Sequence, residues 1–394
     1  MRYHSWIRTI GVSLFGISLL FGTSWAAEKQ PYKVGLIMEL TGGMAAGGAE
    51  CRDGVVIEIE RINASGGING HPIELVTGDT GSEATKAVTA TTKLTRQDKV
   101  LALFGPLYNT LEGPVRAVAE REKTPNLILS TPTPEDRTKN YKWSFTLAQN
   151  EIIVAEAQLE ILKDRGYKKA LAIGDTQSSW QEQIRVLKTK AAGVGIQIIP
   201  MSETFDPAQD LDLSAQVMKV KDLAAKEKPQ ALVLMTNIFS GTPFLKHMKQ
   251  LGFSLPVIGT HAFGVSAGLA MAGDEVNGVL FPAGKVFAAE SLPDSDPQKP
   301  VIIDFRKRFK AKFNYEVGQF GAHSYDAVEL FARAAKVAGP DKAKIRDAIE
   351  KTSKYVGITG VFTFGPKDHE GLTKQSLAIY EIKDKKFVLV KTIK

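Results

Sequence analysis

Apolar and polar residues alternate in blocks along residues 33–80, and the blocks predict a strand, a helix and a second strand. The apolar run Val34–Met38 predicts a buried strand, because short apolar runs beside turn residues are typical of strands. From Glu50 as far as Ile62, apolar residues recur at helical spacing, and a glycine-rich turn follows. A second strand is expected at 72–77. Together these elements predict one right-handed βαβ unit.

The same alternation of strands and helices continues through the chain and predicts an α/β fold built on parallel sheets. Expected helices cover 84–97, 111–123, 151–165, 181–193, 211–227, 242–251, 300–313, 321–338 and 341–351, and expected strands cover 100–104, 127–129, 170–173, 196–200, 230–235, 256–259, 361–364, 376–382 and 387–392.

The amino terminus has the pattern of a secretory signal peptide covering residues 1–26. Arg2 and Arg8 flank an apolar stretch at 10–21, and small residues precede the expected cleavage after Ala26. A transmembrane anchor is the alternative, but the apolar run is shorter than the roughly 20 residues that span a bilayer. The chain is therefore expected to be exported and cleaved.

Composition fits a globular chain of about two domains. The 394 residues are 43% hydrophobic and 24% charged, with a formal charge of +7. The positive charges are interspersed with acidic residues and form no basic stripe, which argues against nucleic acid as a partner. Cys51 is the only cysteine, so no internal disulfide can form, and a packed thiol is expected there.

One stretch of the first βαβ unit resembles a known family. Leu40-Thr41-Gly42, followed by the run from Ile62 to Leu75 (INASGGINGHPIEL), is similar to the opening of type I periplasmic solute-binding proteins. These are the receptors of ABC importers, and the resemblance is to their branched-chain amino-acid binding group.

The resemblance implies two Rossmann-like lobes joined by a three-strand hinge, with the ligand in the cleft between them. It places residues 31–146 and 282–358 in lobe 1, and residues 147–281 and 359–394 in lobe 2. It also implies a monomer in the periplasm that closes on a small carboxylate or amino acid without any cofactor, and delivers it to a permease in the inner membrane.

Ligand-binding positions follow from the resemblance residue by residue. The loops after two lobe 1 strands are expected to contact the ligand carboxylate through side chains and backbone N–H groups. Where relatives hold the α-ammonium with an acidic residue, this chain has His261. An aromatic position of the relatives' first loop corresponds to Gly47, so open space is expected there. The expected contact residues are Gly47, Tyr108, Asn109, Thr110, Ser130, Thr131, Thr133, Trp180, Asn237, Phe239, His261 and Phe263.

These departures favour a carboxylate without an α-amino group, aromatic in the preferred case, over leucine, isoleucine or valine. A buried ammonium without a counter-ion is costly. Phe239 and Phe263 are equally compatible with a place in the core of lobe 2. Two further functions stay open: a binding protein for hydrophobic amino acids, and a sensing ectodomain that serves a signalling receptor.

An enzyme is the weaker hypothesis. The six histidines are dispersed without metal-ligand spacing, and the sequence has no GxSxG, Walker or GxGxxG motif in the required context. Asp79 and Asp175 follow predicted strands, where capping of a turn explains them. Asp326 matches a helix of the family in which it has a packing role.

Overall fold

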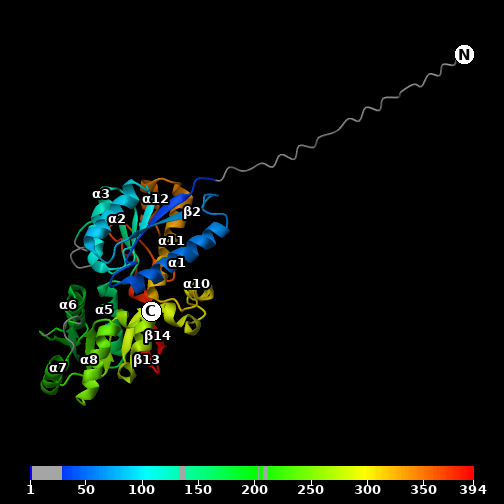
Figure 1. The fold of residues 1–394 in the computed structure, drawn as a ribbon. Helices are drawn as coiled ribbons and strands as arrows, with labels where there is room; N and C mark the ends of the chain where they lie inside the picture. Colours follow the sequence, from blue (N-terminus) through cyan, green and yellow to red (C-terminus); the bar gives the residue numbers. More distant parts are fainter. Residues whose placement is uncertain (2–28, 133–138, 203, 207–211) are drawn as a thin grey trace.

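The computed structural model describes residue 1 and residues 29–132, 139–202, 204–206 and 212–394. The predicted signal peptide and Thr133 therefore lie outside the described residues, apart from Met1. Two sheets, each with its own helices, form two lobes stacked one above the other (Figure 1). None of the described helices is long and apolar enough to cross a membrane.

Lobe 1 contains a five-stranded parallel sheet in the order β2-β1-β3-β4-β5. Four of its strands are almost wholly buried, as expected where helices cover both faces of a parallel sheet, whereas the edge strand β2 is partly exposed. The strands are β1 (Tyr32–Met38), β2 (Ile73–Asp79), β3 (Ala102–Phe104), β4 (Asn126–Ile128) and β5 (Ser144–Thr146), and the helices are α1 (Ala45–Ala64), α2 (Ala84–Arg96), α3 (Glu112–Arg121), α11 (Gln319–Ala338) and α12 (Lys342–Glu350).

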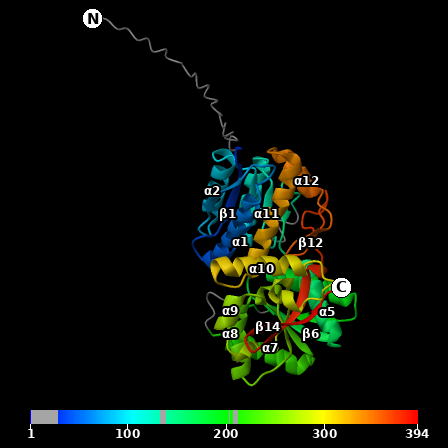
Figure 2. The ribbon, with the colours of Figure 1, turned by 90° about the vertical axis from the view of Figure 1, so that its right-hand side faces the viewer.

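Lobe 2 contains a seven-stranded mixed sheet in the order β14-β13-β10-β9-β8-β6-β7, in which β13 and β14 are antiparallel. The strands are β6 (Lys169–Gly174), β7 (Gln197–Pro200), β8 (Ala231–Met235), β9 (Val257–Ile258), β10 (Leu280–Gly284), β13 (Leu377–Lys383) and β14 (Lys386–Thr392), and the helices are α5 (Glu151–Asp164), α6 (Ser178–Ala192), α7 (Ser214–Glu227), α8 (Ile238–Gln250) and α9 (Ser266–Met271). Helix α10 (Lys299–Phe313) lies across the junction of the lobes (Figure 2).

The chain passes between the two sheets three times: after β5, after β10 and before β13. Two crossings differ from the predicted positions. Strand β10 pairs with β9 and β13, so the whole of it belongs to the lobe 2 sheet, and the boundary expected at 281/282 falls inside a strand.

The strand expected at 361–364 is not part of lobe 2. Its residues form β12 (Val361–Phe362), which pairs only with β11 (Tyr355–Val356). Phe364 packs edge-on against Phe145 of the lobe 1 sheet, with ring centroids 5.3 Å apart. The aromatic side chains hold this hairpin to lobe 1, and the last crossing comes later than the sequence predicted.

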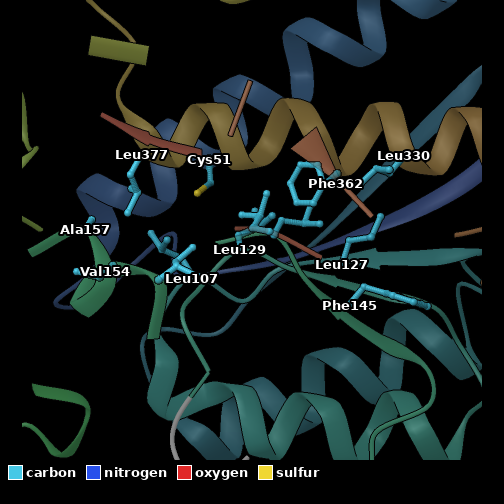
Figure 3. Close-up of a cluster of buried hydrophobic side chains, with 14 of the residues drawn as sticks. Cys51, Leu107, Leu127, Leu129, Phe145, Val154, Ala157, Leu330, Phe362 and Leu377 are labelled. Carbon is cyan, nitrogen blue, oxygen red and sulfur yellow. The ribbon is translucent and has the colours of Figure 1, made fainter. Parts of the chain in front are cut away.

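A continuous apolar cluster joins the lobes at the crossings. Leu127 and Phe145 of lobe 1 and Val154 and Leu377 of lobe 2 belong to the same buried cluster, as Figure 3 shows. Burial of this surface stabilises the junction by roughly 25 cal/mol for each Å² of apolar area removed from water. The crossings are therefore anchored on both sides, which suits a hinge.

Helices α1 and α11 approach closely because α1 has glycine at the contact. A Cβ atom at Gly54 would lie 2.9 Å from the carbonyl oxygen of Gly321. Helix α1 also begins at Ala45, earlier than the expected Glu50, so Gly47 and Gly48 belong to the helix and not to the preceding loop.

Candidate ligand-binding cleft

Polar residues follow the carboxyl ends of the lobe 2 strands and are linked by buried hydrogen bonds. Asp175 Oδ2 accepts a hydrogen bond of 2.7 Å from Thr236 Oγ1, and Thr260 Oγ1 donates to the carbonyl of Thr236 at 2.8 Å. Asp175 also accepts from the backbone N–H of Gln177 at 3.0 Å. The predicted capping role of Asp175 is confirmed, and the bonds fix one strand edge of lobe 2.

Asp79 has the same role in lobe 1. Its carboxylate accepts from the backbone N–H groups of Leu40, Thr41 and Gly81 and from the Thr41 hydroxyl. Burial raises its pKa, but these hydrogen bonds outweigh burial and lower the pKa overall. The loop that leads into α1 is therefore held by an ionised carboxylate.

Ser130 and Thr131 follow β4, as predicted, but their hydroxyl hydrogens are already committed. Ser130 Oγ donates to Glu112 Oε1, and Thr131 Oγ1 donates to the carbonyl of Gln149 at 2.8 Å. A hydroxyl group has one hydrogen to donate. In this arrangement neither residue can donate to a ligand carboxylate, although both can still accept.

The loop after β3 leaves donors free. The side chains of Asn109 and Thr110 form no hydrogen bond with any described residue. Tyr108 packs against the apolar cluster of lobe 1 that includes Leu111 and Val115. Asn109 and Thr110 are thus the better candidates for polar contact with a ligand.

Trp180 and His261 lie together in lobe 2, as a shared ligand contact requires. Their ring centroids are 6.0 Å apart, and Trp180 is 8% exposed. The indole N–H approaches the Asp175 carboxylate without a complete hydrogen bond. His261 Nδ1 is buried with no partner among the described residues, and burial lowers the pKa of His261 to about 4.

His323 is a buried histidine of lobe 1 that the sequence analysis did not select. Its Nδ1 lies 3.0 Å from the carbonyl oxygen of Leu129, at the end of β4, and its Nε2 has no partner among the described residues. Burial lowers its pKa to about 4, and the nearby His261 contributes to the shift. The two histidines belong to different lobes. Only the position of His323 within a predicted apolar helix could have signalled its role.

The structure fills the space that was expected beside Gly47. A Cβ atom there would lie 2.8 Å from Leu107 Cδ2 and 3.4 Å from the ring of Phe320. The prediction of open space is therefore wrong, because Leu107 and Phe320 occupy it. Phe320 supplies an aromatic ring close to the predicted position, but from α11.

A groove opens between the lobes next to this position. It is lined from lobe 1 by α1 and the segment before α11, and from lobe 2 by residues 264–266. Its acidic groups have structural partners: Glu50 Oε1 accepts from the N–H groups of Gly318 and Gly321, and Asp53 accepts from Tyr315.

Three further residues predicted to contact the ligand are Asn237, Phe239 and Phe263, and each has a different environment. Asn237 caps α8, its Oδ1 accepting from the N–H of Ser240 at 3.1 Å. Phe239 is 48% exposed. Phe263 is fully buried in the core of lobe 2 beside Phe281, the second of the two roles expected for it.

Glu39, directly after β1, is a fully buried carboxylate that the sequence analysis did not select. Its Oε2 accepts from the N–H of Leu107 at 3.1 Å, and its Oε1 has no partner among the described residues. Burial raises the pKa of Glu39. The bond to Leu107 ties this carboxylate to the loop after β3, where a ligand contact is expected.

Among residues 29–132, 139–202, 204–206 and 212–394, no group of three or more His, Cys, Asp or Glu side chains is placed to hold a metal ion. Cys51 is buried, and burial raises the pKa of its thiol, which leaves it a packed residue. Two α/β lobes joined by three crossings, with a groove lined from both, have the architecture of a two-lobe ligand-binding protein.

Comparison with known proteins gives the family. The model of the periplasmic binding protein family matches residues 31–386, and the chain belongs to this family. The resemblance inferred from the sequence is thereby confirmed.

Individual relatives are distant but cover nearly the whole chain. The chain is 25% identical to the leucine-, isoleucine-, valine-, threonine- and alanine-binding protein of Pseudomonas aeruginosa, over 90% of this chain and 91% of the relative. The structure is similar to an extracellular ligand-binding receptor from Rhodopseudomonas palustris HaA2, with a TM-score of 0.80, 24% identity and coverage of 92% and 100%. It is also similar to the branched-chain amino acid transporter binding protein LivJ of Streptococcus pneumoniae, solved with isoleucine, with a TM-score of 0.77, 25% identity and coverage of 92% and 100%.

Proposed function

We propose that this chain is the periplasmic receptor of an ABC importer, which captures a small carboxylate without an α-amino group and delivers it to a membrane permease. The preferred ligand is an aromatic carboxylate. Capture proceeds by rotation of the lobes about the three crossings, and the ligand supplies the free energy that favours the closed form.

We infer the class of ligand from the environment of His261. Burial lowers its pKa to about 4, and His261 forms no hydrogen bond or ion pair with a carboxylate among the described residues. The ring is neutral at pH 7 and cannot act as the counter-ion of an ammonium group. It can donate a hydrogen bond to a carboxylate or hydroxyl oxygen, beside the aromatic surface of Trp180.

A binding protein for hydrophobic amino acids is the second candidate, and two observations favour it. Relatives that cover nine-tenths of the chain are named for such ligands. Glu39 also provides a buried carboxylate with one unpartnered oxygen, which would suit an ammonium group.

Thermal shifts of refolded, ligand-free protein separate the two. We expect aromatic and aliphatic carboxylates to raise the melting temperature by mass action, and His261→Ala to reduce the shift. His71→Ala is the matched control, because His71 stacks on Tyr32 at the start of β1, the opposite end of this strand from Glu39.

Stabilisation by leucine or valine alone, abolished in Glu39→Gln and unchanged in His261→Ala, would reject the carboxylate ligand and support the second candidate. Loss of uptake of the stabilising ligand in cells that lack this protein would test delivery to the permease.

A further inference from the structure

The groove between the lobes, beside the start of α11, is a cavity that the proposed carboxylate site does not use. Its volume is about 590 Å³, within the roughly 300–1,000 Å³ that is typical of small-molecule sites. Both lobes supply small or apolar walls, among them Ala46, Ala49 and Phe320 from lobe 1 and Val265 from lobe 2. The groove is not lined by the residues best placed to hold a carboxylate, which are Asn109, Thr110, Trp180 and His261.

The charged side chains that line this groove are all acidic. They belong to Glu50, Asp53 and Glu316, and no basic residue is among the described residues lining it. Asp53 and Glu316 each form ion pairs with basic residues outside the groove. Glu50 forms hydrogen bonds only with backbone N–H groups and has no ion pair with any described residue. Its carboxylate is therefore the one acidic group of the groove without a counter-ion among the described residues.

The Glu50 carboxylate is fixed in place without being neutralised. Its Oε1 accepts from the N–H groups of Gly318 at 2.9 Å and Gly321 at 2.8 Å, which caps the start of α11. The amide oxygen of a glutamine could accept the same two bonds, so capping alone does not require a charge. The positive end of the α11 dipole offsets part of the charge. A cation in the groove would complete the pairing.

Gln319 adds a second acceptor that lacks a partner. It lines the groove, follows Gly318 in the chain and is 5% exposed. Its Oε1 forms no hydrogen bond with any described residue. A buried acceptor without a donor costs free energy, and a bound molecule with N–H groups would remove that cost.

We infer that this groove binds an organic ammonium ion, that is, a positively charged amine on an apolar body. The ammonium group pairs with Glu50 and donates a hydrogen bond to Gln319 Oε1, while the body packs against Phe320 of lobe 1 and Val265 of lobe 2. The site is additional to the proposed carboxylate site and does not rest on it.

Other occupants suit the groove less well. A carboxylate would face acidic side chains with no basic group beside them. A neutral hydroxyl could donate to Gln319 but would leave the charge of Glu50 unpaired. A metal ion would need more ligands than the apolar walls offer, and the described ranges hold no group of three or more His, Cys, Asp or Glu side chains placed for one.

The test compares two molecules with the same body, 2-phenylethylamine and 2-phenylethanol, by isothermal titration calorimetry with ligand-free protein. The measurement is made at pH 8, because burial raises the pKa of Glu50 to about 7 and the carboxylate must be ionised. We expect the amine to bind at least about tenfold more tightly than the alcohol, since the charge is the only feature of the site that separates them.

Glu50→Gln keeps an oxygen for the cap of α11 and removes the charge. We expect it to weaken the amine by about tenfold or more and to bring it to within about twofold of the alcohol. Gln319→Leu removes the second acceptor and should weaken the amine as well, which keeps the site testable if Glu50→Gln does not fold. Glu83→Gln is the matched control, because it also removes one negative charge but Glu83 pairs with Lys86 outside the groove.

Further variants separate this site from the cleft. We expect His261→Ala and Glu39→Gln to leave the affinity for the amine within about twofold, because neither residue lines the groove. No binding of the amine, equal affinity for amine and alcohol, or an affinity that survives both Glu50→Gln and Gln319→Leu would overturn the site and leave the carboxylate receptor intact. Loss of amine binding in Glu39→Gln or His261→Ala would place the amine in the cleft and overturn the groove site, and would also count against a ligand without an amino group.

Discussion

The buried ion pair beneath the Ser130 loop gives the sharpest stability prediction. Glu112 is fully buried and Arg116 is 5% exposed, and Arg116 Nη2 lies 2.9 Å from Glu112 Oε2. Arg116 also donates to Thr146 Oγ1 at 2.8 Å, while Ser130 donates to Glu112. The pair thus connects α3, β5 and the loop after β4.

Glu112→Leu leaves the guanidinium buried, with the Thr146 hydroxyl and the ring of Tyr141 as its remaining partners among the described residues. At a separation of about 3 Å and an effective dielectric constant near 20, the lost attraction is about 5 kcal/mol. Removing one partner of a buried pair costs about 3–5 kcal/mol in measured cases, whereas replacing both by apolar residues is close to neutral. We therefore expect Glu112→Leu to lower the free energy of unfolding by about 3–5 kcal/mol, and the double variant Glu112→Leu/Arg116→Met to regain most of that loss.

The measurement is urea unfolding of ligand-free protein, followed by fluorescence and circular dichroism, for the wild type, both single variants and the double variant. A coupling energy of at least about 2 kcal/mol is expected from the cycle. Single variants that each lose less than about 1 kcal/mol and add up in the double variant would refute the buried pair. Ligand affinity should fall in Glu112→Leu, because Ser130 loses the acceptor that holds its loop.

Three further predictions concern single sites. Burial raises the pKa of Glu50 to about 7, so the folded protein binds more protons than the unfolded chain, and its stability should fall as the pH rises from about 4.5 to 7. Glu50→Gln keeps the accepting oxygen and should flatten this dependence of stability on pH, measured by urea unfolding at several pH values. An unchanged dependence would contradict the raised pKa of Glu50. Gly48→Ala places a Cβ atom 2.0 Å from the carbonyl oxygen of Glu39 and should destabilise the protein by more than about 2 kcal/mol. Gly43→Ala, with open space around it, should be close to neutral. Similar melting temperatures for the two variants would contradict the close approach of α1 to Glu39. Cys51 should resist alkylation in the native protein at pH 8 and react fully in denaturant, and fast native labelling would show that the thiol is not packed.

Much of the architecture could be predicted from the sequence, because the signals are local. The apolar run before Glu39, the helical spacing up to Ile62 and the glycine turn after it are readable along the chain, and the αβ alternation follows from the same patterns. The boundary errors came from short strands. The residues of β12 are apolar and β-prone, and the contact of nearby Phe364 with Phe145 assigns the hairpin to lobe 1.

The sequence by itself determined the class of fold, the family and the strand ends where a ligand is expected, since all of these depend on periodicity and motif order. Tertiary structure decided how the polar atoms are used. It commits the hydroxyl hydrogens of Ser130 and Thr131 to other residues, and it buries Glu39 with one oxygen unpartnered. It also buries His323 with Nδ1 against the Leu129 carbonyl oxygen, because hydrogen-bond partners between distant parts of the chain are set by packing and leave no periodic trace in the sequence.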